Sequence, residues 1–327
     1  MVTGASSGIG RAVARAAGGR GAAVVVSGRN GEALAAAAAE VEAAGGRAVA
    51  VPAEATSAAD HAALCTRAVE HFGRIDSLVC SAMVTVLAEV EQLEADELRR
   101  VLDVNFMGRY YAFRAALPYL KESRGTFVDV NSGLAYRGIP LQAAYCASKA
   151  AGRAFFESAR VELEKHGAGV DVCLVLPGGI NTPQFDRGRQ KLGLQPQPVP
   201  PIYQPEVVAE AVLHCCERPE RELPVTWAAQ RLLWGQKLSP RAGDLYLRRT
   251  GWHAQTTGEP KPVDSPDNLF EPVPGDPGAH GRFDARARGT SGWTQARIRL
   301  GKKGSAVALV GSGLAVLFGY HGLTNRR

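Results

Sequence analysis

Short apolar runs rich in β-branched residues alternate along the chain with longer stretches of helical pattern. Gly, Asp or Pro bounds these runs, as is typical of buried strands, and the runs are residues 24–27, 48–51, 77–80, 126–130 and 170–176. The stretches between them are Ala-rich or amphipathic and predict helices over residues 10–18, 31–44, 58–72, 95–121 and 143–166. Residues 205–218 predict one more helix and residues 223–226 a last short strand. This alternation predicts the α/β class, with a Rossmann-type doubly wound parallel sheet covered by helices on both faces.

The later part of the chain has a different composition, because fifteen of the 19 prolines and all four tryptophans follow Thr182. Residues 227–250 predict a single further helix at the edge of the domain. Residues 251–281 combine Pro, Asp and Gly with little periodicity, which is typical of an extended arm or loop. We therefore predict one domain over residues 1–250, followed by an arm and a basic segment over residues 251–304.

The basic charge of the chain is concentrated at its end. From Arg282 to Arg327 nine Lys and Arg residues accompany one acid, Asp284, so this stretch carries +8 while the whole chain carries +6. A nucleic-acid partner is not predicted, because a groove for phosphates needs its cations on the folded body. The six cysteines form no CxxC pair and no signal segment opens the chain, so we expect reduced thiols and a cytoplasmic protein.

A glycine-rich turn, TGASSGIG at residues 3–10, directly precedes the first predicted helix. Glycines let the backbone approach a pyrophosphate, and the free N–H groups at a helix start favour its negative charge. Alone the motif is weak evidence, since an ordinary tight turn between a strand and a helix has the same composition.

Tyr145 and Lys149 lie four residues apart in a predicted helix, which places the phenol and the ammonium group on one face. Ser132 lies just after the predicted strand 126–130, and doubly wound sheets bind ligands beyond the carboxyl ends of their strands. A neighbouring ammonium group favours the phenolate, and we expect it to lower the pKa of Tyr145.

Together these residues resemble the short-chain dehydrogenase/reductase family over residues 1–230. The resemblance rests on the order of TGASSGIG, the Asn of Asn105-Phe106-Met107-Gly108, Ser132, Tyr145-xxx-Lys149 and Pro177-Gly178-Gly179-Ile180-Asn181-Thr182. It implies an NAD(P)-dependent oxidoreductase that transfers a hydride between nicotinamide and a ketone or secondary alcohol, and it is common for the family to form dimers or tetramers.

The resemblance also implies roles for individual residues. A carbonyl group accepts a hydride readily only when its oxygen is protonated or polarised, so Tyr145 is the candidate acid. Ser132 holds the substrate oxygen, Lys149 additionally holds the nicotinamide ribose, and Asn105 positions a water in a proton relay. The implied cofactor contacts are Gly4, Ser6, Ser7, Gly8, Ile9, Gly10, Glu54, Ala82, Tyr145, Lys149, Pro177, Gly178, Ile180 and Thr182.

Three features depart from the family pattern. Cys80-Ser81-Ala82-Met83 stands where Asn-Asn-Ala-Gly is usual, and Glu54 replaces the usual Asp near the adenine. Only two residues precede Thr3, so the first strand, which is central in the family, is expected to be almost absent. We therefore expect the natural start to lie upstream of Met1 or the chain to be truncated, which the intact mass of natively expressed protein tests.

The end of the second predicted strand bears on the choice between NADP and NAD. An acidic residue there would bond a ribose 2′-hydroxyl and repel a phosphate, but residues 24–30 read VVVSGRN and contain none. Arg29 instead predicts a partner for a 2′-phosphate, assisted by Ser6, which favours NADP (NADPH). The alternative is that Arg29 is an ordinary solvated charge.

The loop over residues 183–204 lies where the family places its substrate loop. Its apolar and aromatic residues either cover a lipophilic substrate or serve as packing, and they are Phe185, Leu192, Leu194, Ile202 and Tyr203. No metal is predicted, because His214-Cys215-Cys216 has no partner set at ligand spacing.

Two functions remain open. The first is an NADP-dependent carbonyl reductase or alcohol dehydrogenase that acts on a small-molecule carbonyl or alcohol. The second is a catalytically weak NADP(H)-binding sensor or interaction protein with the same fold. The set of Ser132, Tyr145, Lys149 and Asn105 favours the enzyme, because a sensor needs no acid, whereas the altered residues 80–83 favour the sensor.

The C-terminal segment predicts a membrane anchor. Between Lys303 and Arg326 run 22 residues without Asp, Glu, Lys or Arg, and residues 305–320 are their apolar centre. A helix of that length reaches about 33 Å, enough for a hydrocarbon core of ~30 Å. We predict a membrane helix over residues 305–323 that holds the enzyme at the cytosolic face. The alternative is an Ala/Gly/Val-rich helix packed on the domain or on a partner subunit.

Cell fractionation tests the anchor. The full chain should sediment with membranes at high speed, and a chain that ends at Gly301 should remain in the supernatant, because it lacks the apolar segment. If both chains remain soluble, the anchor hypothesis is wrong.

Overall fold

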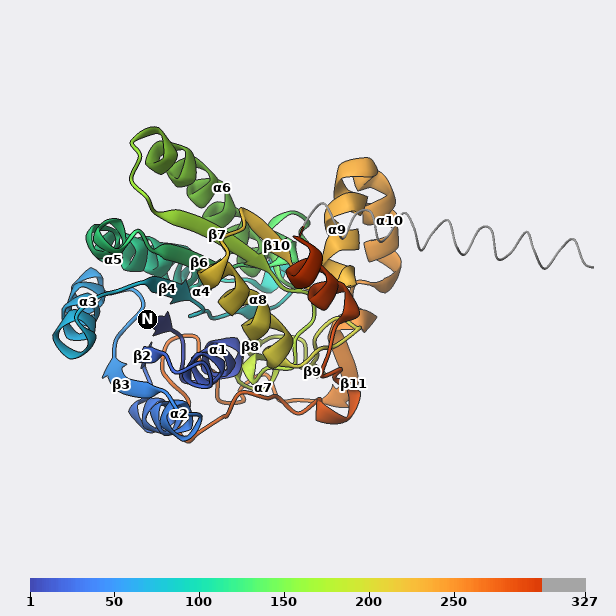
Figure 1. Cartoon of the computed structure of the whole chain (residues 1–327). Helices are drawn as coiled ribbons and strands as arrows, with labels where there is room; N and C mark the ends of the chain where they lie inside the picture. Colours follow the sequence, from blue (N-terminus) through green and yellow to red (C-terminus); the bar gives the residue numbers. More distant parts are fainter. Residues whose placement is uncertain (302–327) are drawn as a thin grey trace, which may run out of the picture.

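The computed structural model describes residues 1–301. Its centre is a seven-stranded parallel sheet in the order β10-β7-β6-β4-β1-β2-β3 (Figure 1). The predicted doubly wound α/β fold is confirmed. The strands of this sheet are β1 (Val2–Thr3), β2 (Ala23–Gly28), β3 (Arg47–Pro52), β4 (Ser77–Cys80), β6 (Thr126–Val130), β7 (Asp171–Leu176) and β10 (Glu222–Pro224).

Helices cover both faces of the sheet (Figure 1). One face carries α1 (Gly8–Gly18), α2 (Gly31–Ala43) and α8 (Pro205–Glu217), and the other carries α3 (Ala58–Phe72), α5 (Gly108–Ser123) and α6 (Ala143–Lys165). Successive strand residues point to opposite faces, so Val24 and Val26 of β2 pack in the apolar cluster with α1 and α8. Val25 packs in the second cluster, on the side of α3, α5 and α6.

The first strand is short but lies at the centre of the sheet. Val2 pairs with Val26 of β2 and with Val79 of β4. Met1 extends this ladder, because its ammonium group donates to Ser77 O at 2.8 Å and its carbonyl accepts from Val79 N–H at 2.9 Å. The strand expected to be almost absent is thus present as a two-residue strand. The strand order reverses beside β1, and doubly wound sheets bind ligands at such a switch point.

One predicted helix is broken by a change of helical type. Residues 95–121 are helical throughout, but a π-helical turn at Asp103–Met107 separates α4 (Ala95–Leu102) from α5. The extra residue in such a turn rotates the following helix relative to the preceding one. The apolar pattern alone gave no sign of it.

A second predicted helix is two helices. Residues 227–250 form α9 (Trp227–Leu238) and α10 (Pro240–Thr250), so the prediction of a single helix was wrong. The Ser239 side chain caps α10 by accepting from Ala242 N–H, and Pro240 occupies its first turn. A proline is tolerated there because the first turn needs no N–H donor, whereas inside one long helix it would remove a hydrogen bond.

The segment after residue 250 packs against the body of the protein. It is mostly irregular, as predicted, but it contains β11 (Thr256–Pro260), which pairs antiparallel with β9 (Leu194–Pro196). Residues 292–301 are helical, and Trp293 contacts Trp227 of α9 with ring centroids 5.1 Å apart. The proposed division of the chain at residue 250 stays a prediction. The remaining short elements are β5 (Val86–Leu87), which pairs with β8 (Arg189–Gln190), and α7 (Gln184–Arg187).

Within residues 1–301, no helix is both long and apolar enough to cross a membrane. The predicted anchor at residues 305–323 lies outside the described part of the chain.

Candidate active site

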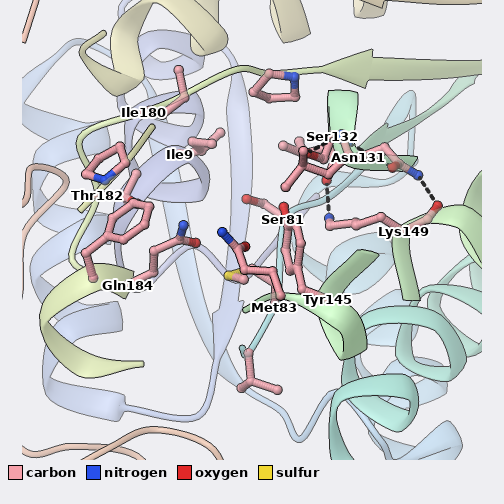
Figure 2. A pocket seen from close by; sticks show the side chains of 18 of the residues that line it. Ile9, Ser81, Met83, Asn131, Ser132, Tyr145, Lys149, Ile180, Thr182 and Gln184 are labelled. Atoms are coloured by element: carbon pink, nitrogen blue, oxygen red, sulfur yellow. Dashed lines mark hydrogen bonds between the residues drawn. The ribbon is translucent and has the colours of Figure 1, made fainter. Parts of the chain in front are cut away.

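A cavity of about 370 Å³ lies at the carboxyl ends of the central strands. It extends from the glycine-rich turn to the start of α6, and Figure 2 shows Tyr145, Ser132 and Lys149 on one side of it. Ile9, Ile180 and Thr182 lie on the other side (Figure 2). The cavity therefore brings the two sequence motifs together. Of the site residues predicted from the sequence, all but Gly10 and Asn105 line it.

The three candidate catalytic side chains converge in this cavity. Tyr145 and Lys149 share one face of α6, and the Lys149 ammonium nitrogen lies 5.5 Å from the centre of the Tyr145 ring. Ser132 caps a short 3₁₀ turn, where its Oγ accepts from Leu134 N–H at 3.1 Å. A hydrogen bond between the Ser132 and Tyr145 side chains favours the phenolate and acts to lower the pKa of Tyr145.

Burial dominates the protonation of this cluster. It raises the pKa of Tyr145 to about 12, although the Ser132 hydrogen bond and the charge of Arg109 act in the opposite direction. Burial also lowers the pKa of Lys149 well below its usual range, and the positive charge of Arg109 lowers it further. The expected lowering of the Tyr145 pKa is therefore wrong for this structure, because desolvation of the phenolate outweighs the Ser132 hydrogen bond and the charge of Arg109. Tyr145 is a protonated acid at neutral pH.

A buried polar network fixes the position of Lys149. Its Nζ donates to Val130 O at 2.8 Å, and its main-chain carbonyl accepts from Asn131 Nδ2 at 3.3 Å. Asn131 Nδ2 also donates to Asp129 Oδ2 at 2.7 Å, and Asp129 forms an ion pair with Arg109 at 2.6 Å. Sequence analysis missed this network. The sequence did contain one signal for this network, namely Asp129. A charged residue in a buried strand requires a partner.

Asn105 lies in the π-helical turn and is fully buried. Its Oδ1 accepts from Val84 N–H at 2.8 Å, while its Nδ2 donates to Val84 O at 2.9 Å and to Ser148 Oγ at 3.1 Å. These contacts use the amide oxygen and both amide hydrogens, and they hold Val84, which lines the cavity. The role of Asn105 in positioning a water stays a prediction.

The glycine-rich turn fits a pyrophosphate. Gly4 has φ +68°, and a Cβ built there would lie 2.4 Å from Ala82 N, while a Cβ at Gly10 would lie 2.2 Å from Gly4 O. Within residues 1–301, the N–H groups of Ile9 and Gly10 in the first turn of α1 have no hydrogen-bond partner. The turn therefore offers close backbone approach and free donors at the positive end of a helix, as a phosphate group requires. Gly10 contributes by letting α1 pack against the turn.

Arg29 lines the same cavity as the glycine-rich turn. It is largely buried, with 20% of its side chain exposed. Its Nη1 donates to Phe270 O and its Nη2 to Asn268 O, both at 2.6 Å. Its Nε lies 3.9 Å from a carboxylate oxygen of Glu54, and Ser6 lines the same space. A guanidinium group has five N–H bonds, and because two bind carbonyls and Nε faces Glu54, one on each Nη remains for a ligand. This burial disfavours the alternative that Arg29 is merely a solvated charge.

The half of the cavity next to Tyr145 has an apolar wall. Helices α9 and α10 form part of it, and the wall includes Leu134, Ile139, Val199, Leu232 and Leu247. Of the apolar residues in the predicted substrate loop, Phe185 lines the cavity, whereas Ile202 and Tyr203 are buried in the packing. For those two residues packing is the better interpretation.

Cysteine and metal chemistry have little support in the described part of the chain. Burial raises the pKa of Cys80 to about 12 and also raises that of Cys146, so neither is a ready thiolate. Residues 1–301 contain no group of three His, Cys, Asp or Glu side chains placed to hold a metal ion.

The fold and the site together define a dinucleotide-binding α/β protein with a tyrosine, a serine and a lysine at its ligand cavity. A family described as short chain dehydrogenase matches residues 1–192. The uncharacterized oxidoreductase YxnA of Bacillus subtilis strain 168 is 33% identical over 263 residues, which cover 80% of this chain and 74% of that protein. The chain therefore belongs to the short chain dehydrogenase family, whose members are oxidoreductases that bind a nicotinamide cofactor.

Two further proteins are similar over part of their length. The 11-beta-hydroxysteroid dehydrogenase 1A of Arabidopsis thaliana is 37% identical over 187 residues, which cover 56% of this chain and 52% of that protein. The match thus spans about half the length of the plant protein. The alcohol dehydrogenase of the archaeon Thermococcus sibiricus, solved in complex with 5-hydroxy-NADP, is 26% identical with a TM-score of 0.60. That likeness covers 68% of this chain and 93% of the archaeal one.

Proposed function

We propose that this chain is an NADP-dependent oxidoreductase that transfers a hydride between nicotinamide and a lipophilic ketone or secondary alcohol. The observation that carries the proposal is that Tyr145, Ser132 and Lys149 share one cavity with the glycine-rich turn before α1. A protonated, buried phenol beside a hydroxyl group is suited to stabilise and protonate an oxygen on which negative charge develops.

Each residue has a distinct part in this chemistry. A bound nicotinamide supplies the hydride for reduction and accepts it in oxidation. The Ser132 hydroxyl donates to the substrate oxygen, and the Tyr145 phenol gives its proton to the same oxygen as the negative charge forms. Lys149 binds the ribose hydroxyls through its Nζ and places this donor close to the phenol, while burial keeps water away from the reacting oxygen.

Four observations support the finer points of the proposal, and one opposes the choice of NADP. The positive charge of Arg29 and the lack of an acid at the end of β2 favour NADP, as does the 5-hydroxy-NADP bound to the similar archaeal enzyme. Glu54, near Arg29, is the feature that favours NAD instead. The apolar wall formed in part by α9 and α10 favours a lipophilic substrate.

A paired assay tests the proposed function. NADPH oxidation is measured with a series of ketones and quinones, including homologous ketones of increasing chain length, and NADPH binding is measured by fluorescence. We expect turnover with a KM that falls as the chain lengthens, since each buried methylene group adds about 0.8 kcal/mol. Binding without turnover on any substrate would support the alternative of a catalytically weak sensor.

Replacing Arg29 by Asp should reverse the cofactor preference. An Asp at this position accepts from a ribose 2′-hydroxyl and repels a 2′-phosphate. The measurement is the ratio of kcat/KM for NADPH to kcat/KM for NADH. Arg29→Lys keeps the positive charge and should keep the preference for NADPH. An unchanged ratio in the Arg29→Asp protein would remove Arg29 from the phosphate site.

Membrane attachment through residues 305–323 is a second proposal, and the surface of α9 and α10 supports it. Leu238 is 84% exposed and Tyr246 is 66% exposed, and Lys237 and Arg241 are exposed on the same pair of helices. Exposed apolar and basic side chains together are typical of helices at a membrane interface. The helix over residues 292–301, the last described part of the chain, contacts the start of α9 through Trp293.

A further inference from the structure

One segment of the C-terminal part runs along the phosphate-binding end of the cavity. Residues 267–281, here called the clasp segment, belong to the orange part of the chain that passes beside α2 and α1 in Figure 1. The segment contains Pro272, Pro274 and Pro277, which have no N–H group and disfavour a helix or a central strand. It therefore offers mainly carbonyl oxygens to the body of the protein.

The body supplies hydrogen-bond donors to these carbonyls along the whole segment. The donors come from the glycine-rich turn, from the end of β2 and from α4. They are Arg29 Nη2 to Asn268 O (2.6 Å), Arg100 Nε to Leu269 O (3.0 Å), Arg29 Nη1 to Phe270 O (2.6 Å), Asn30 Nδ2 to Val273 O (3.2 Å) and Gly275 O (3.1 Å), and Gly8 N to Gly278 O (3.2 Å).

Two anchors hold the clasp segment in place. Leu269 is fully buried in an apolar cluster with Val84, Val101 and Val104, close to the cavity. Farther along, the Asp276 carboxylate pairs with the guanidinium group of Arg11 in α1, with Arg11 Nη2 3.0 Å from Asp276 Oδ2.

The two partners of this ion pair differ in exposure. Arg11 is almost wholly buried and also binds Glu40, whereas one third of the Asp276 side chain is exposed. The hydrogen bond from Arg11 lowers the pKa of Asp276, so the carboxylate stays ionised at neutral pH. This second anchor thus meets solvent on the side of Asp276, while Arg11 keeps Glu40 as a further partner.

The cavity itself connects the clasp segment to the cofactor site. Asn268 lines the same space as Arg29, Glu54 and Ser6. A ligand that occupies this end therefore touches the segment. The segment also binds the N–H group of Gly8, next to the free donors of the first turn of α1.

We propose that the clasp segment is part of the cofactor site. It encloses the adenosine end of a bound nicotinamide dinucleotide, holds Arg29 in place through the carbonyls of Asn268 and Phe270, and has to release the Arg11–Asp276 pair before the cofactor leaves. This inference rests on the proposed function, because it requires a dinucleotide in the cavity. It adds a segment outside the region that matches the family, residues 1–192, to the cofactor site.

The first test measures how fast NADPH leaves the full-length protein. In Asp276→Asn the charge that pairs with Arg11 is removed at constant size, and we expect NADPH displaced by excess NADP to dissociate about fivefold to tenfold faster. Asp264→Asn is the matched control, because Asp264 is exposed and has no hydrogen bond or ion pair within residues 1–301. It should dissociate at the wild-type rate. Equal rates in all three proteins would overturn the clasp.

The second test uses the wild-type protein and does not depend on how a variant folds. Chymotrypsin should cleave after Phe270, which is 40% exposed, and NADPH should slow this cleavage at least about fivefold because the enclosed cofactor holds the segment closed. Cleavage after Leu238, which is 84% exposed at the end of α9, should not change. Cleavage after Phe270 that is equally fast with and without bound NADPH would overturn the clasp alone. A wild-type protein that binds neither NADPH nor NADH would overturn the proposed function and the clasp together.

Discussion

Replacing Tyr145 by Phe is expected to abolish carbonyl reduction while leaving NADPH binding nearly unchanged. The substitution keeps the ring, which lines the cavity, and removes only the hydroxyl group that donates the proton. General-acid catalysis contributes about 10²- to 10⁴-fold, so kcat should fall by that factor. Because the proton is transferred only in the transition state, the dissociation constant of NADPH, measured by fluorescence, should stay close to that of the wild type.

Tyr136 provides a matched control for this substitution. Burial raises its pKa to about 12, as it does for Tyr145, but its hydroxyl group donates to Glu222 outside the cavity. Tyr136→Phe removes a phenolic hydroxyl with a similarly raised pKa and should retain turnover. Wild-type turnover in the Tyr145→Phe protein would show that Tyr145 is not the acid.

The pH dependence of kcat/KM in the wild-type protein tests independently whether Tyr145 is the proton donor. A phenol donates a proton only while it is protonated, and burial raises the pKa of Tyr145 to about 12. The value of kcat/KM for reduction reports on the free enzyme, so it should be level through neutral pH and fall only in strongly alkaline solution. A fall centred near neutral pH would contradict the raised pKa.

The elements of the sheet could be predicted from the sequence because their cause is local. Residues 126–130 are rich in β-branched residues and follow a glycine, and they form β6 as predicted. The division of residues 227–250 into two helices was also encoded locally, by Ser239 as a cap and Pro240 in a first turn. The π-helical turn at Asp103–Met107 was not, because its cause is the tertiary contact of Asn105 with Val84. Such contacts leave no periodic trace.

In the candidate site, too, the features with a local cause could be predicted from the sequence and those with a long-range cause could not. Tyr145, Lys149 and Ser132 were found because their spacing along one helix and one strand end is itself the signal. The clasp segment was not, because its position depends on carbonyl oxygens that every sequence carries and on donors such as Arg11 and Arg29, more than 200 residues away. The direction of the Tyr145 pKa shift was missed for a related reason. Spacing locates a neighbouring charge, but only the structure shows how deeply the phenol is buried.

Replacing Lys149 by Met is expected to impair both turnover and cofactor binding. The Nζ of Lys149 sits in the cavity wall between Tyr145 and the end of β6, where it donates to Val130 O at 2.8 Å. A hydrogen bond is worth about 0.5–1.5 kcal/mol net, so loss of the proposed ribose contact should weaken NADPH binding about twofold to tenfold. Turnover should fall further, by at least about 10²-fold, because the donor beside the phenol is lost as well.

The structure predicts that this variant folds. Met fills most of the volume of the lysine side chain, and Val130 O keeps a hydrogen bond from Arg109 Nη2 at 3.2 Å. A thermal melt checks that expectation, and Lys165→Met, at the exposed end of α6, is the matched control and should retain both binding and turnover. Lost turnover with wild-type NADPH affinity would remove Lys149 from the ribose site but keep it beside the acid. If turnover and affinity both stay at wild-type values in a folded Lys149→Met protein, a lysine that is only 2% exposed has a structural role alone, and the proposed chemistry of the cavity fails with it.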